Sequence, residues 1–220
     1  GGNPLADITA TRAIERVWKA GRAVDREAFR RSVAEALAAA AAKAAVPPAL
    51  ASGRALVSSF DDGSLATVFG TRWAETTDRV IGGSSTARLE VVDGGAAGTA
   101  RALRITGEVR TGAPFPWAGA IFMLSTPPAP ADLSGAGGLA FHAKGDGRTY
   151  QVLVFSRRGG QTPAVASFRA GPEWSEHHFP WSAFNGSDGS DILGIAITAG
   201  PPAGPFELLI DEVELRPGAQ

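Results

Sequence analysis

The sequence contains no cysteine, one methionine, one tyrosine and three histidines in 220 residues. The absence of cysteine excludes disulfides, thiolate metal ligands and a cysteine nucleophile. His177 and His178 are neighbours that would point to opposite faces of a strand, so a three-histidine zinc site is hard to build. His142 stands in an apolar run, and no G-x-S-x-G motif is present. The residues therefore favour a chain without a catalytic site of its own.

A large net charge and long apolar runs are also missing. The formal net charge is -1, so no basic excess supports a nucleic-acid partner and no charge block suggests an anionic membrane partner. No apolar run approaches the roughly 20 residues of a membrane helix, and no signal-peptide pattern is visible. We expect no nucleic-acid partner and no membrane span, and the sequence leaves the compartment open.

Turn-forming residues are abundant, with 28 glycines and 15 prolines that are spread out rather than periodic. This spacing is typical of an antiparallel sandwich or barrel, because many tight turns separate short strands. The sequence predicts a mostly β protein with short strands at residues 55–60, 67–73, 87–92, 100–106, 117–124, 138–143, 150–155, 164–168, 174–179, 192–198 and 206–215.

The first 46 residues have a different sequence pattern from the predicted β domain. We expect a β-hairpin at 14–24 and a helix at 26–45 with Asp25 as its N-cap. The apolar side chains of this helix recur at helical spacing on one narrow face, as Phe29, Val33, Leu37 and Ala40. Pro47 and Pro48 would stop the helix.

The chain is therefore predicted to have two parts. Residues 1–46 form the hairpin and helix, 47–54 are a linker, and 55–217 form the β-sandwich domain. The narrow apolar stripe of the helix would dock on a neighbouring element or on a partner domain.

The segment 73–86 is the main candidate for ligand contact. It places Trp73, Asp78 and Arg79 beside the adjacent glycines Gly82 and Gly83. Aromatic faces can stack on sugars while nearby polar groups form hydrogen bonds, and Trp117 in a proline-rich loop is the expected exposed aromatic. The alternatives are core packing for Trp73 and Trp174, and an Asp78–Arg79 salt bridge that stiffens the loop.

Carboxylates gather at the two ends of the sandwich domain. Asp61 and Asp62 follow the first strand, and Asp211 lies on the last. First and last strands are often neighbours in a jelly roll, so these oxygens could form a structural calcium site. Two solvated strand ends are the favoured alternative, because the number of ligands cannot be counted from sequence.

Four motifs resemble the complex I intermediate-associated protein 30 family. The first is Trp73 followed by Asp78-Arg-Val-Ile-Gly-Gly-Ser-Ser85, and three later stretches agree in order: Gly145-Asp-Gly-Arg-Thr-Tyr150, residues 174–184 and Leu209-Ile-Asp-Glu-Val-Glu-Leu215. The resemblance covers residues 60–215 and implies an antiparallel jelly-roll β-sandwich like the galactose-binding domain. Gly145-Asp-Gly147 itself is interpreted as a hairpin turn.

The N-terminal residues resemble another family. Gly2-Asn-Pro-Leu-x-Asp-Ile8 and Ile14-Glu-x-Val-Trp-Lys-x-Gly-Arg-x-Val24 are similar to the C-terminal end of imidazolonepropionase-like metal-dependent amidohydrolases. In that family the segment closes a small β-domain beside a metal-bearing barrel, which is absent from this chain. The resemblance implies the tail of a larger hydrolase of C–N bonds that carries a divalent metal such as zinc upstream.

Three hypotheses for function follow. The first is a non-catalytic accessory module that binds a glycan, peptide or protein surface, or braces an upstream amidohydrolase barrel. The second is a free-standing protein-interaction or assembly domain. The third is a carbohydrate-binding module that uses Trp117 and the loop from Trp73 to Ser85. No cofactor is expected in this chain apart from the calcium considered above.

Overall fold

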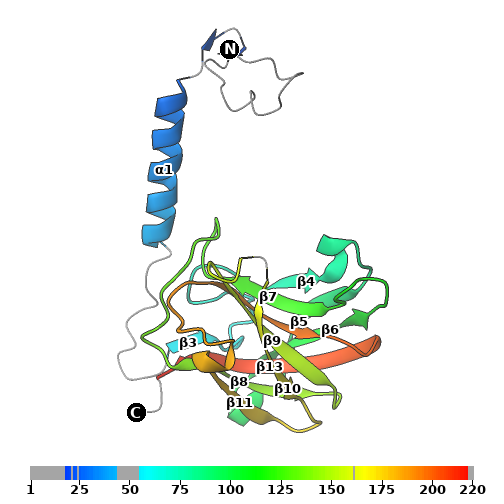
Figure 1. Cartoon of the computed structure of the whole chain (residues 1–220). Helices are drawn as coiled ribbons and strands as arrows, with labels where there is room; N and C mark the ends of the chain where they lie inside the picture. The colour runs from blue at the N-terminus through cyan, green and yellow to red at the C-terminus, as the bar shows by residue number, and fades with distance from the viewer. Residues whose placement is uncertain (1–17, 21, 24, 44–54, 161, 218–220) are drawn as a thin grey trace. The chain divides into compact units, whose positions relative to one another are not determined.

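The computed structural model describes residues 18–20, 22–23, 25–43, 55–160 and 162–217 (Figure 1). The chain divides into two compact units, Gly1–Ala40 and Ala41–Gln220. The expected linker at 47–54 lies outside the described residues. Among the described residues, no helix is long and apolar enough to cross a membrane.

The N-terminal unit contains the expected hairpin and helix. Strands β1 (Trp18–Lys19) and β2 (Arg22–Ala23) pair antiparallel, while the outer ends of the predicted hairpin lie outside the described residues. Helix α1 (Arg26–Lys43) begins as predicted, because Asp25 Oδ1 accepts hydrogen bonds from the N–H groups of Glu27 and Ala28 at 3.0 and 2.9 Å. Phe29 and Val33 on α1 are 63% and 40% exposed.

The second unit is an antiparallel β-sandwich, which confirms the predicted fold class. One sheet has five strands in the order β10-β9-β12-β7-β4, and the other has the order β11-β8-β13-β6-β5 with β3 also pairing β13. The strands are β3 (Ala55–Ser58), β4 (Ala74–Thr77), β5 (Thr86–Asp93), β6 (Arg101–Val109), β7 (Ala118–Met123), β8 (Gly138–Gly145), β9 (Thr149–Ser156), β10 (Ala164–Arg169), β11 (Ser175–Pro180), β12 (Ile192–Ala199) and β13 (Gly204–Arg216). The first and last strands of the sandwich, β3 and β13, are neighbours as expected.

The core lies between the two sheets and is built by alternation along the strands. On β9, for example, Tyr150, Val152 and Val154 are at most 1% exposed and pack in the core, while the residues between them face outward. Short 3-10 helices close the connections: η2 (Asp78–Ile81), η3 (Ala96–Gly98) and η4 (Trp181–Ala183).

Two local predictions are wrong. Residues 67–73 do not form a strand but a tight turn, in which Thr67 N–H donates to the carbonyl of Thr71 at 2.9 Å and Gly70 has φ 74°. The strand in this region is β4 (Ala74–Thr77), which directly follows the turn and lies inside the segment predicted to be irregular. The turn at Gly145-Asp-Gly147 connects β8 to β9 in different sheets, so it is not a hairpin.

Candidate functional site

A row of four uncharged polar residues and one glycine crosses the outer face of the five-stranded sheet. The strand registers place Ser167 opposite Gln151, Gln151 opposite Thr198, Thr198 opposite Gly119, and Gly119 opposite Thr76. Ser167, Gln151, Thr198 and Gly119 each adjoin core residues along their strands, and Thr76 is paired with Gly119, so the five positions share the face directed away from the sandwich core. We call Ser167, Gln151, Thr198, Gly119 and Thr76 the polar row.

An apolar row lies directly beside the polar row. It consists, strand by strand, of Val165, Leu153, Ala196, Ile121 and Ala74. Val165 is 40% exposed, and Leu153 and Ile121 are partly exposed. The face therefore offers hydrogen-bonding groups and apolar contact surface in two parallel stripes, which a flat amphipathic ligand can use together.

The outward-facing side chains of the central strand β12 are buried. Ala196 and Thr198 are each only 1% exposed, although their alternation with Ile195 and Ile197 directs them away from the core. The hydroxyl of Thr198 is buried and has no hydrogen-bond partner within the described structure. Because this hydroxyl has almost no accessible surface, it offers a ligand no direct contact, and its lack of a partner is a local cost to stability.

Trp117 connects the polar row to the loop before β7. Its indole Nε1–H donates to Thr76 Oγ1 at 3.3 Å, and its carbonyl accepts from the backbone N–H of Asp78 at 3.0 Å. Trp117 is half-buried, so it is not the exposed aromatic that the sequence suggested. The exposed aromatic residue of this loop is Phe115, which is 77% exposed.

Asp78 is fully buried and organises the loop between β4 and β5. Its carboxylate accepts hydrogen bonds from the Ser85 N–H at 3.0 Å and the Ser85 hydroxyl at 2.7 Å. The Ser85 oxygen also accepts from Arg110 N–H at 2.9 Å, which ties this loop to the one before β7. Within the described residues no ion pair joins Asp78 to the exposed Arg79, so the salt-bridge alternative is wrong. Asp78 positions the loop and has no surface to offer a ligand.

Gly82 and Gly83 are required for different structural reasons. Gly82 ends η2 with φ 86°, in the left-handed region that L-residues with side chains disfavour. Gly83 packs on Asp78, and a Cβ at this position would lie 2.2 Å from the carboxylate carbon. Both therefore shape the loop, and neither brings a side chain to a ligand.

Trp73 is a core residue rather than a ligand platform. It is 1% exposed, its Nε1–H donates to Ser58 Oγ at 3.1 Å, and its ring lies 4.7 Å from that of Phe122. The predicted stacking role for Trp73 therefore has no accessible surface, and the core-packing alternative holds. Trp174, by contrast, is only half-buried.

The three aspartates predicted as calcium ligands are hydrogen-bonded by the chain itself. Asp211 accepts from Ala96 N–H, Thr99 hydroxyl and Glu212 N–H at 2.8, 2.5 and 2.7 Å. Burial raises the pKa of Asp211, the hydrogen bonds oppose that rise, and the nearby charge of Asp61 adds to it. Asp61 binds the N–H groups of residues 100 and 101, and Asp62 binds Ser64.

These contacts bring Asp61 and Asp211 near each other, as the sequence suggested. Within the described residues, no group of three or more His, Asp or Glu side chains is arranged to hold a metal ion. The calcium site stays a prediction, and the thermal midpoint with calcium against that with a chelator would test it.

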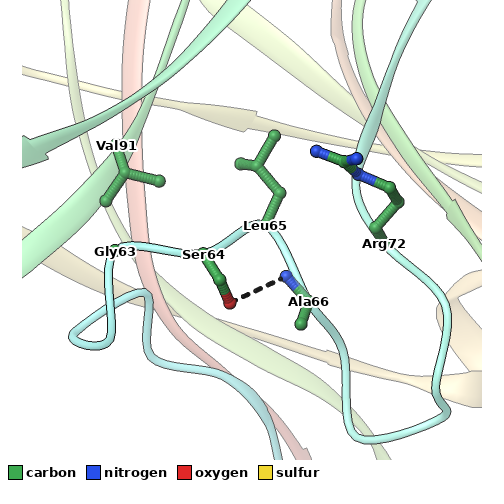
Figure 2. A pocket seen from close by; sticks show the side chains of 6 residues that line it. All are labelled: Gly63, Ser64, Leu65, Ala66, Arg72 and Val91. Carbon is green, nitrogen blue, oxygen red and sulfur yellow. Dashed lines mark hydrogen bonds between the residues drawn. The ribbon is translucent and has the colours of Figure 1, made fainter.

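A shallow hollow of about 570 Å³ lies at the sandwich edge, beside the turn that precedes β4 (Figure 2). Leu65 and Val91 form its apolar side, and Arg72 lines the other. Ser64 accepts from Ala66 N–H at 3.2 Å, which fixes the local chain. Trp117 and the polar row do not line the hollow, so it is separate from the outer face of the five-stranded sheet.

Sequence reasoning missed the polar row entirely. Gln151 and Thr198 stand in apolar runs, and Thr76 was part of a predicted loop. The one available signal was the single polar residue, Gln151 or Thr198, in each of these apolar runs, which marks an outward side chain. The strand register decides which of these residues lie side by side across the five strands. The sequence of a single strand does not determine that register.

Solved structures share this architecture. A family 11 carbohydrate-binding module from Clostridium thermocellum, in complex with a beta-1,3-1,4-mixed-linked tetrasaccharide, matches with TM-score 0.54 and 18% identity over 76% of this chain and 98% of that chain. An exo-beta-agarase matches with TM-score 0.56 and 12% identity over 75% of this chain and 25% of that chain. At these identities the likeness establishes the fold. The comparison with curated proteins gave no match.

The family assignment comes from the sequence itself. The family model described as complex I intermediate-associated protein 30 matches residues 64–192, more than half of the chain. The match contains Trp73, the turn at 145–150, and the contact of Asp78 with Ser85 on which Gly83 packs. The chain therefore belongs to the complex I intermediate-associated protein 30 family.

Proposed function

We propose that the sandwich is a glycan-binding module and that the outer face of its five-stranded sheet is the binding face. The observation that carries this proposal is the polar row beside the apolar row, continuous across five strands. A sugar ring has apolar C–H faces and hydroxyls at its edge, so the two stripes offer each part of the ring a matching surface.

The size and charge of the face indicate the kind of glycan. Five strands span four intervals of about 4.8 Å, or roughly 19 Å, which suits a short oligosaccharide better than a single sugar. Neither row contains an Asp, Glu, Lys or Arg. An uncharged glycan therefore fits, because its binding would leave no buried charge without a partner.

The structural neighbours support this proposal. The clostridial module of the same fold was solved with a mixed-linked tetrasaccharide. From this chain itself, the exposed Ser167 and the partly exposed Gln151 give the face hydrogen-bonding groups that a glycan can reach.

The proposal is tested by calorimetric titration of the full chain with beta-1,3-1,4-mixed-linked glucan tetrasaccharide and with an agaro-oligosaccharide. Gln151→Ala and Ser167→Ala each remove one accessible hydrogen-bonding group from the polar row, and we expect about 2- to 10-fold weaker binding for each. Both side chains are at least partly exposed, so the thermal midpoints of the two variants should equal that of the unaltered chain, which excludes unfolding as the cause.

Thr106→Val is the matched control, because Thr106 lies on β6 of the other sheet. It should bind the glycan like the unaltered chain. Absence of binding by the unaltered chain at millimolar glycan would contradict the proposal. Equal losses in the polar-row variants and in Thr106→Val would also contradict it.

We also propose that the module is an accessory to a metal-dependent amidohydrolase, joined through residues 1–24. The support is the sequence likeness of residues 2–8 and 14–24 to the end of such enzymes, and the hairpin β1–β2 that falls within the second stretch. The zinc and the hydrolytic residues would belong to the upstream barrel.

The intact mass of the native protein, detected with an antibody to the sandwich, tests the accessory role. A band several hundred residues larger than this chain is the expected result. A band near 22.6 kDa would contradict it and would favour a free-standing protein-interaction domain.

A further inference from the structure

Phe115 is the most exposed large aromatic side chain in the described part of the sandwich. It is 77% exposed and lies in the connection between β6 and β7, in the stretch Ala113-Pro-Phe-Pro-Trp117. Leaving a phenyl ring in water forgoes about 2 kcal/mol of burial, so its position calls for a partner.

The connection is held firmly at both ends. At its start, Arg110 N–H donates to Ser85 Oγ at 2.9 Å. At its end, Trp117 accepts from Asp78 N–H at 3.0 Å and donates from its indole to Thr76 at 3.3 Å. Pro114 and Pro116 fix the φ angles on either side of the ring near -65°. A connection restricted in this way loses little backbone conformational entropy when a ligand binds.

The connection also stands where the polar row ends. Thr76 on the edge strand β4 is the last member of the row, and Trp117, two residues after Phe115, is hydrogen-bonded to it. On η2, which follows β4, Val80 and Ile81 are 81% and 49% exposed. The segment that follows β4 therefore adds exposed apolar side chains next to the edge strand.

We infer that Phe115 forms an outlying subsite, in which its ring stacks on a sugar of a glycan chain that runs along the polar row and leaves the sheet over β4. This inference rests on the proposed glycan-binding function. It specifies the ligand further as an oligosaccharide or polysaccharide chain, because a monosaccharide on the sheet cannot also reach Phe115.

Chain-length dependence tests the subsite. Calorimetric titration with beta-1,3-1,4-mixed-linked glucan oligosaccharides from two to six sugars should give affinity that rises with length in the unaltered chain. Phe115→Ala should bind the disaccharide like the unaltered chain and the longest oligosaccharide about 2- to 10-fold more weakly. Phe115→Trp should restore or exceed the original affinity for the longest one.

Val68→Ala is the matched control, because Val68 is also an exposed apolar residue at 41% and lies on the turn before β4. Its affinities should equal those of the unaltered chain. If Phe115→Ala keeps full affinity for the hexasaccharide while polar-row variants lose theirs, the subsite is refuted and the binding face stands. If no oligosaccharide binds the unaltered chain, both proposals are refuted.

Discussion

Asp78 and Ser85 form the contact on which the loop between β4 and β5 depends. Both oxygens of the buried carboxylate bind Ser85, and the Ser85 oxygen binds the backbone of Arg110. Gly83 must lack a Cβ because the carboxylate occupies that space. The spacing Asp-x-x-x-x-Gly-x-Ser in the family motif is therefore explained by one local hydrogen-bond arrangement rather than by ligand contact.

Ser85→Ala should lower the free energy of unfolding by about 2 kcal/mol, because it leaves one oxygen of Asp78 and the N–H of Arg110 buried without partners. Denaturant unfolding followed by tryptophan fluorescence measures this change. Ser84→Ala, at the exposed neighbouring position, is the control and should be within about 0.5 kcal/mol of the unaltered chain. Equal stabilities of the two variants would show that the Ser85 contact contributes nothing.

His177 gives the sandwich a dependence on pH. Burial lowers the pKa of His177 from its ordinary value of 6.5, and the charge of His142 lowers it further. The imidazole ring lies 4.8 Å from Phe168 and 5.8 Å from Phe141. Folding therefore favours the neutral ring, so the stability is complete above pH 6.5 and decreases as pH falls through that value toward the lowered pKa.

We expect the free energy of unfolding to decrease between pH 7 and pH 5, and His177→Gln should make this decrease smaller. His178→Gln is the control, since His178 is exposed on the opposite face of β11, and it should keep the original dependence. Denaturant titrations at several pH values measure both. A parallel decrease in all three proteins would assign the pH dependence to other groups.

At the scale of elements, Trp73 attaches the connection between β3 and β4 to the core. Its indole N–H reaches Ser58 on β3, and its ring packs between Phe60 and Phe122 at 6.2 and 4.7 Å. The backbone N–H of Trp73 also donates to Leu65 at 2.8 Å. The turn at 67–71 can therefore stay on the surface while its base is fixed.

Trp73→Phe should lower the free energy of unfolding by about 2 kcal/mol or more, because it leaves a cavity and removes the indole N–H that donates to the Ser58 oxygen, which keeps its own hydrogen bond to the Ala66 carbonyl. Trp174→Phe offers a comparison at a half-buried position and should cost clearly less. Thermal and denaturant unfolding give both values. A larger loss for Trp174→Phe would mean that the connection before β4 is not fixed by Trp73.

At the scale of the whole molecule, β13 is the strand that holds the six-stranded sheet together. It is 13 residues long and pairs with β3, β6 and β8. All described strand pairs of the sandwich lie within residues 55–217. Strand pairing therefore gives the sandwich no dependence on the N-terminal unit.

A chain that begins at Gly53 should fold with a thermal midpoint within about 3 °C of the full chain and a far-ultraviolet circular dichroism spectrum without the helical contribution of α1. It should also keep the glycan affinity of the full chain. A midpoint much lower than this would show that the N-terminal unit supports the sandwich.

Local patterns in the sequence determined most of the strands, the helix and its Asp25 cap, and the antiparallel class of the fold, because each depends on residues close together in the chain, whereas β4 was not recognised. The pairing of first and last strands also followed, from the general topology of jelly rolls. The family motifs were visible as sequence, although their physical reason was not.

Only the tertiary structure decided which residues share the binding face. Alternation shows that Gln151 and Val152 point to opposite sides, but the facing sheet decides which side is buried. Trp73 and Trp117 were both candidates for ligand contact, with core packing as the alternative for Trp73, and long-range packing put Trp73 in the core and left the half-buried Trp117 at the end of the polar row. Register across five strands, set by contacts far apart in sequence, brought Ser167 and Thr76 into one row.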